Sequence, residues 1–126
     1  MIDKNKKILL VEDSVYTRDL YEEVLKEAGW TVDTAVDGQE AIVKAEEGGY
    51  DLILLDIMMP NMNGLEFLKE YEKKELKKKN KKVTLLTNMA HDPVVQEAIK
   101  LGVNGYLIKA ELSPDQLVEE VKKLLV

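Results

Sequence analysis

The chain contains no cysteine, and no apolar run comes near the length of about 20 residues that a membrane-spanning helix requires. Without cysteine it can form no disulfide bond, no thiolate nucleophile and no zinc–thiolate site. The start of the chain, residues 1–7, is polar and rich in lysine, and it lacks the apolar core of a signal peptide. These absences predict a cytoplasmic protein with no membrane segment.

Positive charge is in deficit. The 18 basic residues face 24 acidic ones, which gives a net charge of −6 and argues against nucleic acid as a partner. A lysine-rich segment, residues 73–82, runs against this trend with seven lysines. We expect it to be a solvated helix end and loop, because cations favour a helix C-terminus. A docking patch is the alternative interpretation.

Short, nearly continuous apolar runs recur along the chain, as expected for parallel strands that are covered on both faces. The four clear runs and a weaker fifth are Ile8–Val11, Leu52–Leu55, Val83–Leu86, Tyr106–Ile108 and Thr31–Val36. A helical pattern follows each run, with Gly29 as a stop after the first. Helix-capping residues precede the other four helices: Asp37, Asn63, Asp92 and Ser113.

Strands and helices therefore alternate five times. This order predicts an α/β fold, a (βα)5 doubly wound parallel sheet with right-handed crossovers. The length of 126 residues fits a single domain, residues 1–126. No output domain is expected, so any output would act through a partner protein.

Polar side chains follow four of the five strands, at the carboxyl edge where open α/β sheets bind ligands. Glu12 and Asp13 follow the first strand, Asp56 the third, Thr87 the fourth and Lys109 the fifth. Each has an ordinary explanation alone, such as a helix start, a turn or an exposed lysine. Their placement on one edge is what indicates a site.

The chemistry of that edge favours phosphoryl transfer. If the first and third strands are neighbours, Asp13 and Asp56 lie close enough to share an ion. Oxygen ligands without His or Cys select a hard cation, and Mg²⁺ fits best. Lys109 supplies positive charge for phosphate oxygens. Positioning and charge neutralisation are most of what phosphoryl transfer requires.

Four segments together resemble the receiver domain of two-component response regulators over essentially the whole chain. They are ILLVEDS at residues 8–14, DLILLDIMMPNMNG at 51–64, LLTN at 85–88 and GYLIKA at 105–110. The resemblance implies a chemotaxis-regulator-like, stand-alone receiver with a flavodoxin-like three-layer sandwich and strand order 2-1-3-4-5. It implies a phosphoacceptor switch that catalyses only its own phosphorylation and dephosphorylation.

The metal ligands are likewise implied by the resemblance. Asp13, Asp56 and the backbone carbonyl of Met58 would bind Mg²⁺ directly, and Glu12 would reach it through water. Pro60 and Gly64 would shape the loop that follows Asp56.

The resemblance also assigns the phosphoryl chemistry and the switch. Asp56 would be the phosphoacceptor, Thr87 and Lys109 would bind the phosphoryl oxygens, and Thr87 and Tyr106 would form the switch. The donor would be a phosphohistidine on a sensor histidine kinase or phosphotransfer protein. The downstream protein is not identified, and a monomer and a phosphorylation-dependent dimer are both compatible.

Two positions depart from the family pattern. Asn88 stands where a small residue is usual, which leaves the lifetime of the phosphorylated state open. Ala110 stands where proline is usual, often after a cis bond. A cis bond before alanine costs about 3 kcal/mol, so both isomers of the Lys109–Ala110 bond remain open.

Other functions fit less well. A haloacid-dehalogenase-type phosphatase needs a second aspartate two residues after its nucleophile, and that position here is Met58. A flavin mononucleotide carrier needs a phosphate loop after the first strand, where the acidic pair would repel phosphate. A receiver-like protein-binding module that is never phosphorylated remains the alternative.

Overall fold

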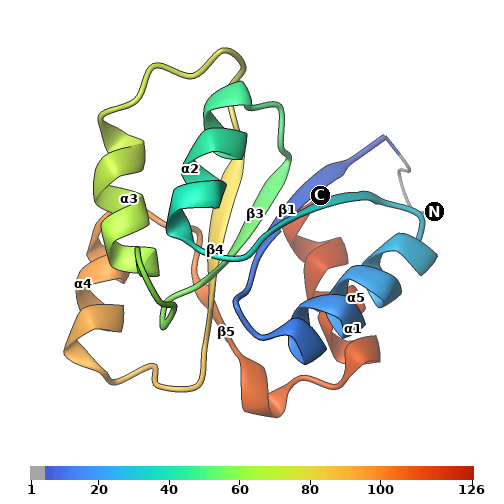
Figure 1. Ribbon diagram of the computed structural model, residues 1–126. Helices are drawn as coiled ribbons and strands as arrows, with labels where there is room; N and C mark the ends of the chain where they lie inside the picture. The colour runs from blue at the N-terminus through green and yellow to red at the C-terminus, as the bar shows by residue number, and fades with distance from the viewer. Residues whose placement is uncertain (1–4) are drawn as a thin grey trace.

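Five strands and five α-helices alternate along residues 5–126, the part of the chain that the computed structural model describes (Figure 1). Residues 1–4 of the polar start lie outside the described residues. The strands are β1 (Lys7–Val11), β2 (Thr31–Ala35), β3 (Leu52–Asp56), β4 (Lys82–Thr87) and β5 (Tyr106–Ile108). All strand pairs are parallel, in the order β2-β1-β3-β4-β5. The predicted fold class and strand order are confirmed.

The continuous apolar runs are explained by burial on both sides of the sheet. In β1, Ile8 and Leu10 face one hydrophobic cluster while Leu9 and Val11 face the other. Every residue of β3 is buried, as expected for the central strand. Side chains alternate between faces along a strand, so a strand that is covered twice needs apolar residues at every position.

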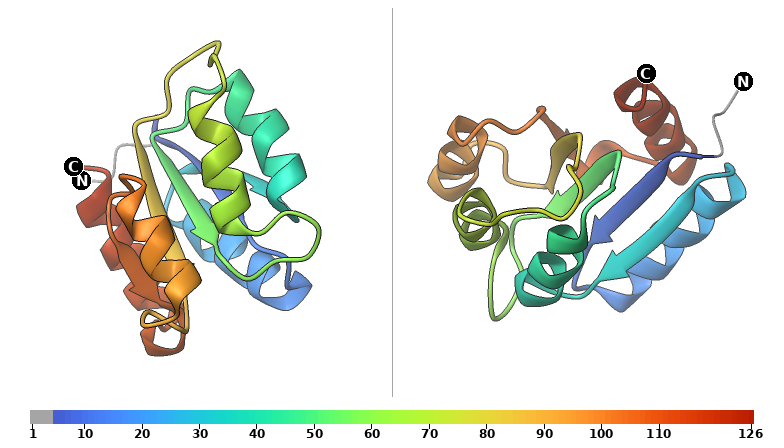
Figure 2. Two further views of the ribbon diagram at one scale, coloured as in Figure 1. Left: turned by 90° about the vertical axis from the view of Figure 1, so that its left-hand side faces the viewer. Right: turned by 90° about the horizontal axis from the view of Figure 1, so that it is seen from above.

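The helices are α1 (Val15–Glu27), α2 (Gly38–Glu47), α3 (Gly64–Glu72), α4 (Pro93–Lys100) and α5 (Pro114–Leu124). Helices α2, α3 and α4 cover one face of the sheet, and α1 and α5 cover the other (Figure 2). The result is a three-layer sandwich. None of the helices in the described part of the chain has the length and apolar character to cross a membrane.

The predicted N-caps are all present, with one difference in detail. Asn63 and Ser113 form reciprocal capping boxes with the third helical residue. Asp37 accepts a hydrogen bond from the Glu40 backbone N–H, but the Glu40 carboxylate binds the N–H of Val36. The α2 cap therefore reaches one residue further back than a capping box does.

A turn of 3-10 helix, η1 (Lys109–Glu111), follows β5 and was not expected from the sequence. Its hydrogen bond runs from the Leu112 N–H to the Lys109 carbonyl at 3.2 Å. No peptide bond in the described residues is cis, so the Lys109–Ala110 bond is trans. The isomer left open by the sequence is thus settled in favour of the unstrained form.

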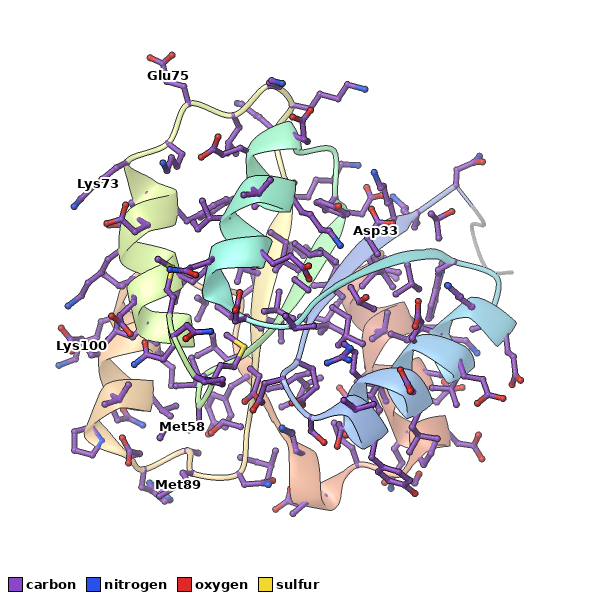
Figure 3. The ribbon with its side chains drawn as sticks, in the orientation of Figure 1. Asp33, Met58, Lys73, Glu75, Met89 and Lys100 are labelled. Atoms are coloured by element: carbon purple, nitrogen blue, oxygen red, sulfur yellow. The ribbon has the colours of Figure 1, made fainter. Side chains whose placement is uncertain are left out.

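The lysine-rich segment runs from Lys73, the C-cap of α3, through the loop to Lys82, the first residue of β4. In Figure 3, Lys73 and Glu75 stand at the opposite end of the molecule from Met58 and Met89. Several of its lysines pair with acids of the chain, for example Lys77 with Glu47 at 2.9 Å. These pairs neutralise part of the positive charge and support the interpretation as a solvated loop.

The loop after Asp56 packs tightly at Gly64, the first residue of α3. The Gly64 N–H donates to the Ile57 carbonyl at 2.9 Å. A Cβ at this position would lie 2.7 Å from the Asp56 carbonyl oxygen and 2.8 Å from the Ile57 side chain. The backbone of Gly64 is therefore packed directly against the end of β3, with no room for a side chain.

We expect Gly64→Ala to lower the free energy of unfolding by about 1–3 kcal/mol through this overpacking, although alanine is the better helix former by about 1 kcal/mol. Urea denaturation measures the change. Glu72→Ala, at an exposed position of the same helix, is the control and should shift stability by less than about 0.5 kcal/mol. Equal stability of Gly64→Ala and the parent would contradict the crowding.

Candidate functional site

The carboxyl ends of β1, β3, β4 and β5 bring the predicted polar residues to one edge of the sheet. Asp56 is the last residue of β3 and Thr87 the last of β4, while Lys109 directly follows β5. Helix α1 begins only at Val15, after a Ser14 cap. Glu12 and Asp13 therefore belong to the strand edge and are not the first turn of the helix.

Three carboxylates crowd together at this edge. One oxygen from each of Glu12, Asp13 and Asp56 lies within 4.8 Å of the other two. Glu12 is 0% exposed and Asp56 is 4% exposed, while Asp13 is partly exposed. Buried like charges at this spacing repel strongly, so the group requires a cation, a proton or both.

Lys109 supplies one positive charge. Its Nζ lies 2.7 Å from Glu12 Oε1 and 3.5 Å from Asp56 Oδ2. Burial acts to lower the pKa of Lys109, but contacts with Glu12 and Asp56 outweigh it and raise the pKa above the usual value. The ammonium group is therefore charged and is shared between the two buried acids.

One lysine does not balance three acids. Burial, followed by the neighbouring Glu12, raises the pKa of Asp56 to about 7, although Lys109 opposes the change. The buried Glu12 carboxylate already uses both oxygens: Oε1 contacts the Lys109 ammonium at 2.7 Å, and Oε2 accepts the Ser14 N–H at 3.1 Å. The site holds more negative charge than its own groups neutralise.

The donor set fits a hard divalent cation. It offers carboxylate oxygens from three residues and no His or Cys, and a single ammonium group faces these three acids. Mg²⁺ accepts a few protein oxygens and keeps several waters, which suits a cluster with one partly exposed member. Met58, whose carbonyl was the fourth expected ligand, lies in the loop at the same end of the molecule (Figure 3).

Thr87 and Tyr106 lie on the same face of adjacent strands. Thr87 pairs with Ile108 and Leu85 with Tyr106, so two positions along the sheet separate them. Thr87 is 2% exposed, and its Oγ1 accepts the Met89 N–H at 3.0 Å. Tyr106 is 45% exposed. The structure thus places a buried hydroxyl near a half-exposed aromatic ring on the edge strand.

Sequence patterns missed some residues that support the acidic pair. Arg18, the single arginine of the chain, donates from Nη1 to the carbonyls of Glu12 at 3.0 Å and Asp13 at 3.3 Å. Tyr21 is buried nearby: burial chiefly raises its pKa, Lys109 opposes this, and Glu12 adds to it. The one available signal was that Arg18 follows the acidic pair closely in the sequence.

Comparison with known proteins places this arrangement in context. A sequence model described as response regulator receiver domain matches residues 8–122. The chain is 32% identical over 120 residues to the chemotaxis protein CheY of Thermotoga maritima, covering 94% of this chain and 97% of that protein. It is 35% identical over 133 residues to hybrid signal transduction histidine kinase B of Dictyostelium discoideum, covering 98% of this chain but only 7% of that kinase.

A solved structure is also similar to this chain. The receiver domain of a sensor histidine kinase from Pseudomonas aeruginosa superposes with a TM-score of 0.82 at 27% identity, covering 96% of this chain and 98% of that one. That structure holds a magnesium ion in its active-site cleft. The similarity therefore extends over the whole sheet and all five helices, including the edge that carries the acids.

The pKa of Asp56, raised to about 7, gives stability a pH dependence. Between about pH 4 and 7, folded protein without bound metal retains a proton that the unfolded chain releases. Its free energy of unfolding should therefore fall as pH rises through this window and level off above it. We expect Asp56→Asn to lack this component. Urea denaturation from pH 4.5 to 8 in chelator compares the two proteins.

The carboxyl carbon shift of Asp56 gives a direct check by NMR titration. Glu12→Gln should lower the Asp56 pKa, because it removes the neighbouring negative charge that raises this pKa most. A parent and an Asp56→Asn variant whose stabilities differ by a constant amount at every pH would show that the carboxyl is ionised throughout.

Proposed function

The chain belongs to the response regulator receiver domain family of two-component signalling, and on that premise we propose that Asp56 accepts a phosphoryl group from a phosphohistidine in a Mg²⁺-dependent reaction. Receiver domains interact with histidine kinases or phosphotransfer proteins, and they bind Mg²⁺ at an acidic site. The observation that carries the proposal is the buried Asp56 carboxylate at the end of β3, beside two further acids and the Lys109 ammonium.

In the proposed step, one Asp56 carboxylate oxygen forms a bond to phosphorus while the bond from phosphorus to the donor imidazole nitrogen breaks. The electron pair of that bond stays on the imidazole nitrogen. Asp56 must be ionised to attack, yet burial and Glu12 favour its protonated form. Positive charge close to the cluster shifts Asp56 toward the reactive carboxylate.

Asp13, Asp56 and the Met58 carbonyl would hold the Mg²⁺ directly, and Glu12 would hold it through water. When bound, the ion supplies the charge that the three carboxylates and the incoming phosphoryl oxygens lack. The crowding of three carboxylates around one ammonium group and the absence of soft ligands from the described cluster support this assignment. Arg18 holds the carbonyls of the acidic pair in place.

Lys109 and Thr87 would bind the phosphoryl oxygens. The Lys109 Nζ already lies 3.5 Å from an Asp56 oxygen, so a phosphoryl group on Asp56 would arrive within its reach. Thr87 stands one residue past Leu86, the β4 partner of Asp56. Its hydroxyl can rotate from its local contact with the Met89 N–H toward a stronger, charged acceptor.

We propose that this movement is the start of the switch. A Thr87 hydroxyl drawn toward the phosphoryl group vacates space on the face it shares with Tyr106, and the half-exposed ring can turn inward. A partner that prefers the altered surface of α4, β5 and α5 would then bind the phosphorylated form. In this scheme the chain catalyses only its own phosphorylation and dephosphorylation.

Acetyl phosphate with Mg²⁺ should add one phosphoryl group to the chain, seen by intact-mass analysis. Asp56→Asn should abolish the addition, because an amide nitrogen does not replace the attacking carboxylate. Asp115→Asn, at an exposed position in the first turn of α5, is the control and should react like the parent. Withholding Mg²⁺ should stop the reaction, and Asp13→Asn should raise the Mg²⁺ concentration that it needs.

The same experiment separates the competing functions. Continuous release of phosphate with no labelled protein would indicate a phosphatase. An unlabelled parent that leaves acetyl phosphate intact would indicate a protein-binding module. Full labelling of Asp56→Asn would move the acceptor to another residue.

Thr87→Ala should leave Asp56 able to accept phosphoryl but weaken the response beyond it. Beryllofluoride, which mimics the phosphoryl group, should shift amide signals across residues 93–125 in the parent and much less in Thr87→Ala. Thr84→Ala is the matched control, because Thr84 is a buried threonine three residues earlier on the same strand, on the opposite face of the sheet. Equal shifts in the parent and in Thr87→Ala would rule out Thr87 as the link.

A further inference from the structure

A side chain from the loop after β4 is tied to the backbone of the turn after β5. The Asn88 Oδ1 accepts a hydrogen bond from the Ala110 N–H at 2.6 Å, across 22 residues of sequence. Ala110 lies in the 3-10 turn η1, directly after Lys109. The bond therefore ends one residue from the lysine whose ammonium group contacts the buried acids.

The bond continues the β4–β5 pairing past its last step. Strand β5 has only three residues, and the pairing ends with Thr87 opposite Ile108. Asn88 and Ala110 lie beyond that point, in the segments that follow β4 and β5. Their hydrogen bond holds the two segments together where the ladder stops, and Thr87 and Lys109 are the residues on either side of that junction.

The hydrogen bond to Asn88 requires a residue with a backbone N–H at position 110, such as the alanine found there. Proline would have no N–H to donate to Asn88. Proline would also disfavour the helical backbone of the residue before it, and Lys109 is the first residue of η1. The trans Lys109–Ala110 bond, the turn and the Asn88 amide thus form one compatible set.

We propose that Asn88 is a positioning residue that holds Lys109 over the acidic cluster through the Ala110 N–H. The inference rests on the proposed function for the role of Lys109, but the contact itself does not. Lysine has a long, flexible side chain, so its reach to Asp56 depends on where its backbone is held. Asn88 fixes that backbone relative to Thr87, and so keeps the two phosphoryl-binding residues at a constant spacing.

NMR tests the contact without any phosphorylation. In the parent, the Ala110 amide should exchange slowly and show a coupling through the hydrogen bond to the Asn88 side-chain carbonyl carbon. Asn88→Ala should abolish both the slow exchange and the coupling. It should also move the Lys109 Cε–Hε signals toward those of a free lysine. Asn88→Asp keeps an oxygen acceptor and should restore the protection of the Ala110 amide. Met89→Ala, in the same exposed loop, is the control and should change neither.

The functional test measures the rate of the acetyl phosphate reaction and the affinity for Mg²⁺. Loss of one hydrogen bond should slow phosphorylation of Asn88→Ala by about fivefold, with Mg²⁺ affinity unchanged, since Asn88 is not a proposed ligand. Ala110→Pro removes the donor, so adding Asn88→Ala in that background should have no further effect. If the two positions acted independently, Asn88→Ala and Ala110→Pro would each slow phosphorylation, and their effects would add in the double variant.

Several results would overturn the inference. An Ala110 amide that is equally protected in Asn88→Ala shows that the bond is absent. Lys109 signals and reaction rates unchanged by loss of the bond show that it does not position Lys109. If the parent fails to accept phosphoryl while the Ala110 and Lys109 signals respond as expected, the proposed function is wrong and the positioning contact stands.

Discussion

The close contact of the Lys109 ammonium with two buried carboxylates is the interaction on which the site depends. Glu12 and Asp56 are removed from water at the end of two core strands, where an uncompensated charge is very unfavourable. Lys109 offsets part of that cost from the turn that follows β5. The sheet therefore acts as a frame that forces charges together, and the residual negative charge favours the binding of a cation.

The two ends of the sheet carry opposite charge. One edge of the sheet concentrates negative charge around Asp56, while the lysine-rich loop lies at the other end and pairs with acids such as Glu47. Between them, two apolar clusters fill the space under the helices. Because the core is closed on both faces, the loops at the strand ends carry the chemistry and can differ without disturbing the packing.

Much of this arrangement could be predicted from the sequence. Strands that are covered on both faces produce continuous apolar runs, and a parallel sheet brings the residue after each run to the same edge. The sequence alone therefore placed Asp56, Thr87 and Lys109 at that edge. Contacts between loops have no such periodic signal. The Asn88–Ala110 bond, the η1 turn and the support from Arg18 depend on how irregular segments meet in space, and local patterns do not encode that.

The shortness of β5 has a consequence for motion. A central strand such as β3 is bonded on both sides and can separate only when the whole domain unfolds, whereas β5 sits at the margin, is paired on one side and spans three residues. Opening this margin breaks few hydrogen bonds and exposes little apolar surface, so its free energy of local opening is low and its amides exchange early. The molecule is thereby stiff where Asp56 is anchored and more easily opened at Tyr106, the first residue of this marginal strand.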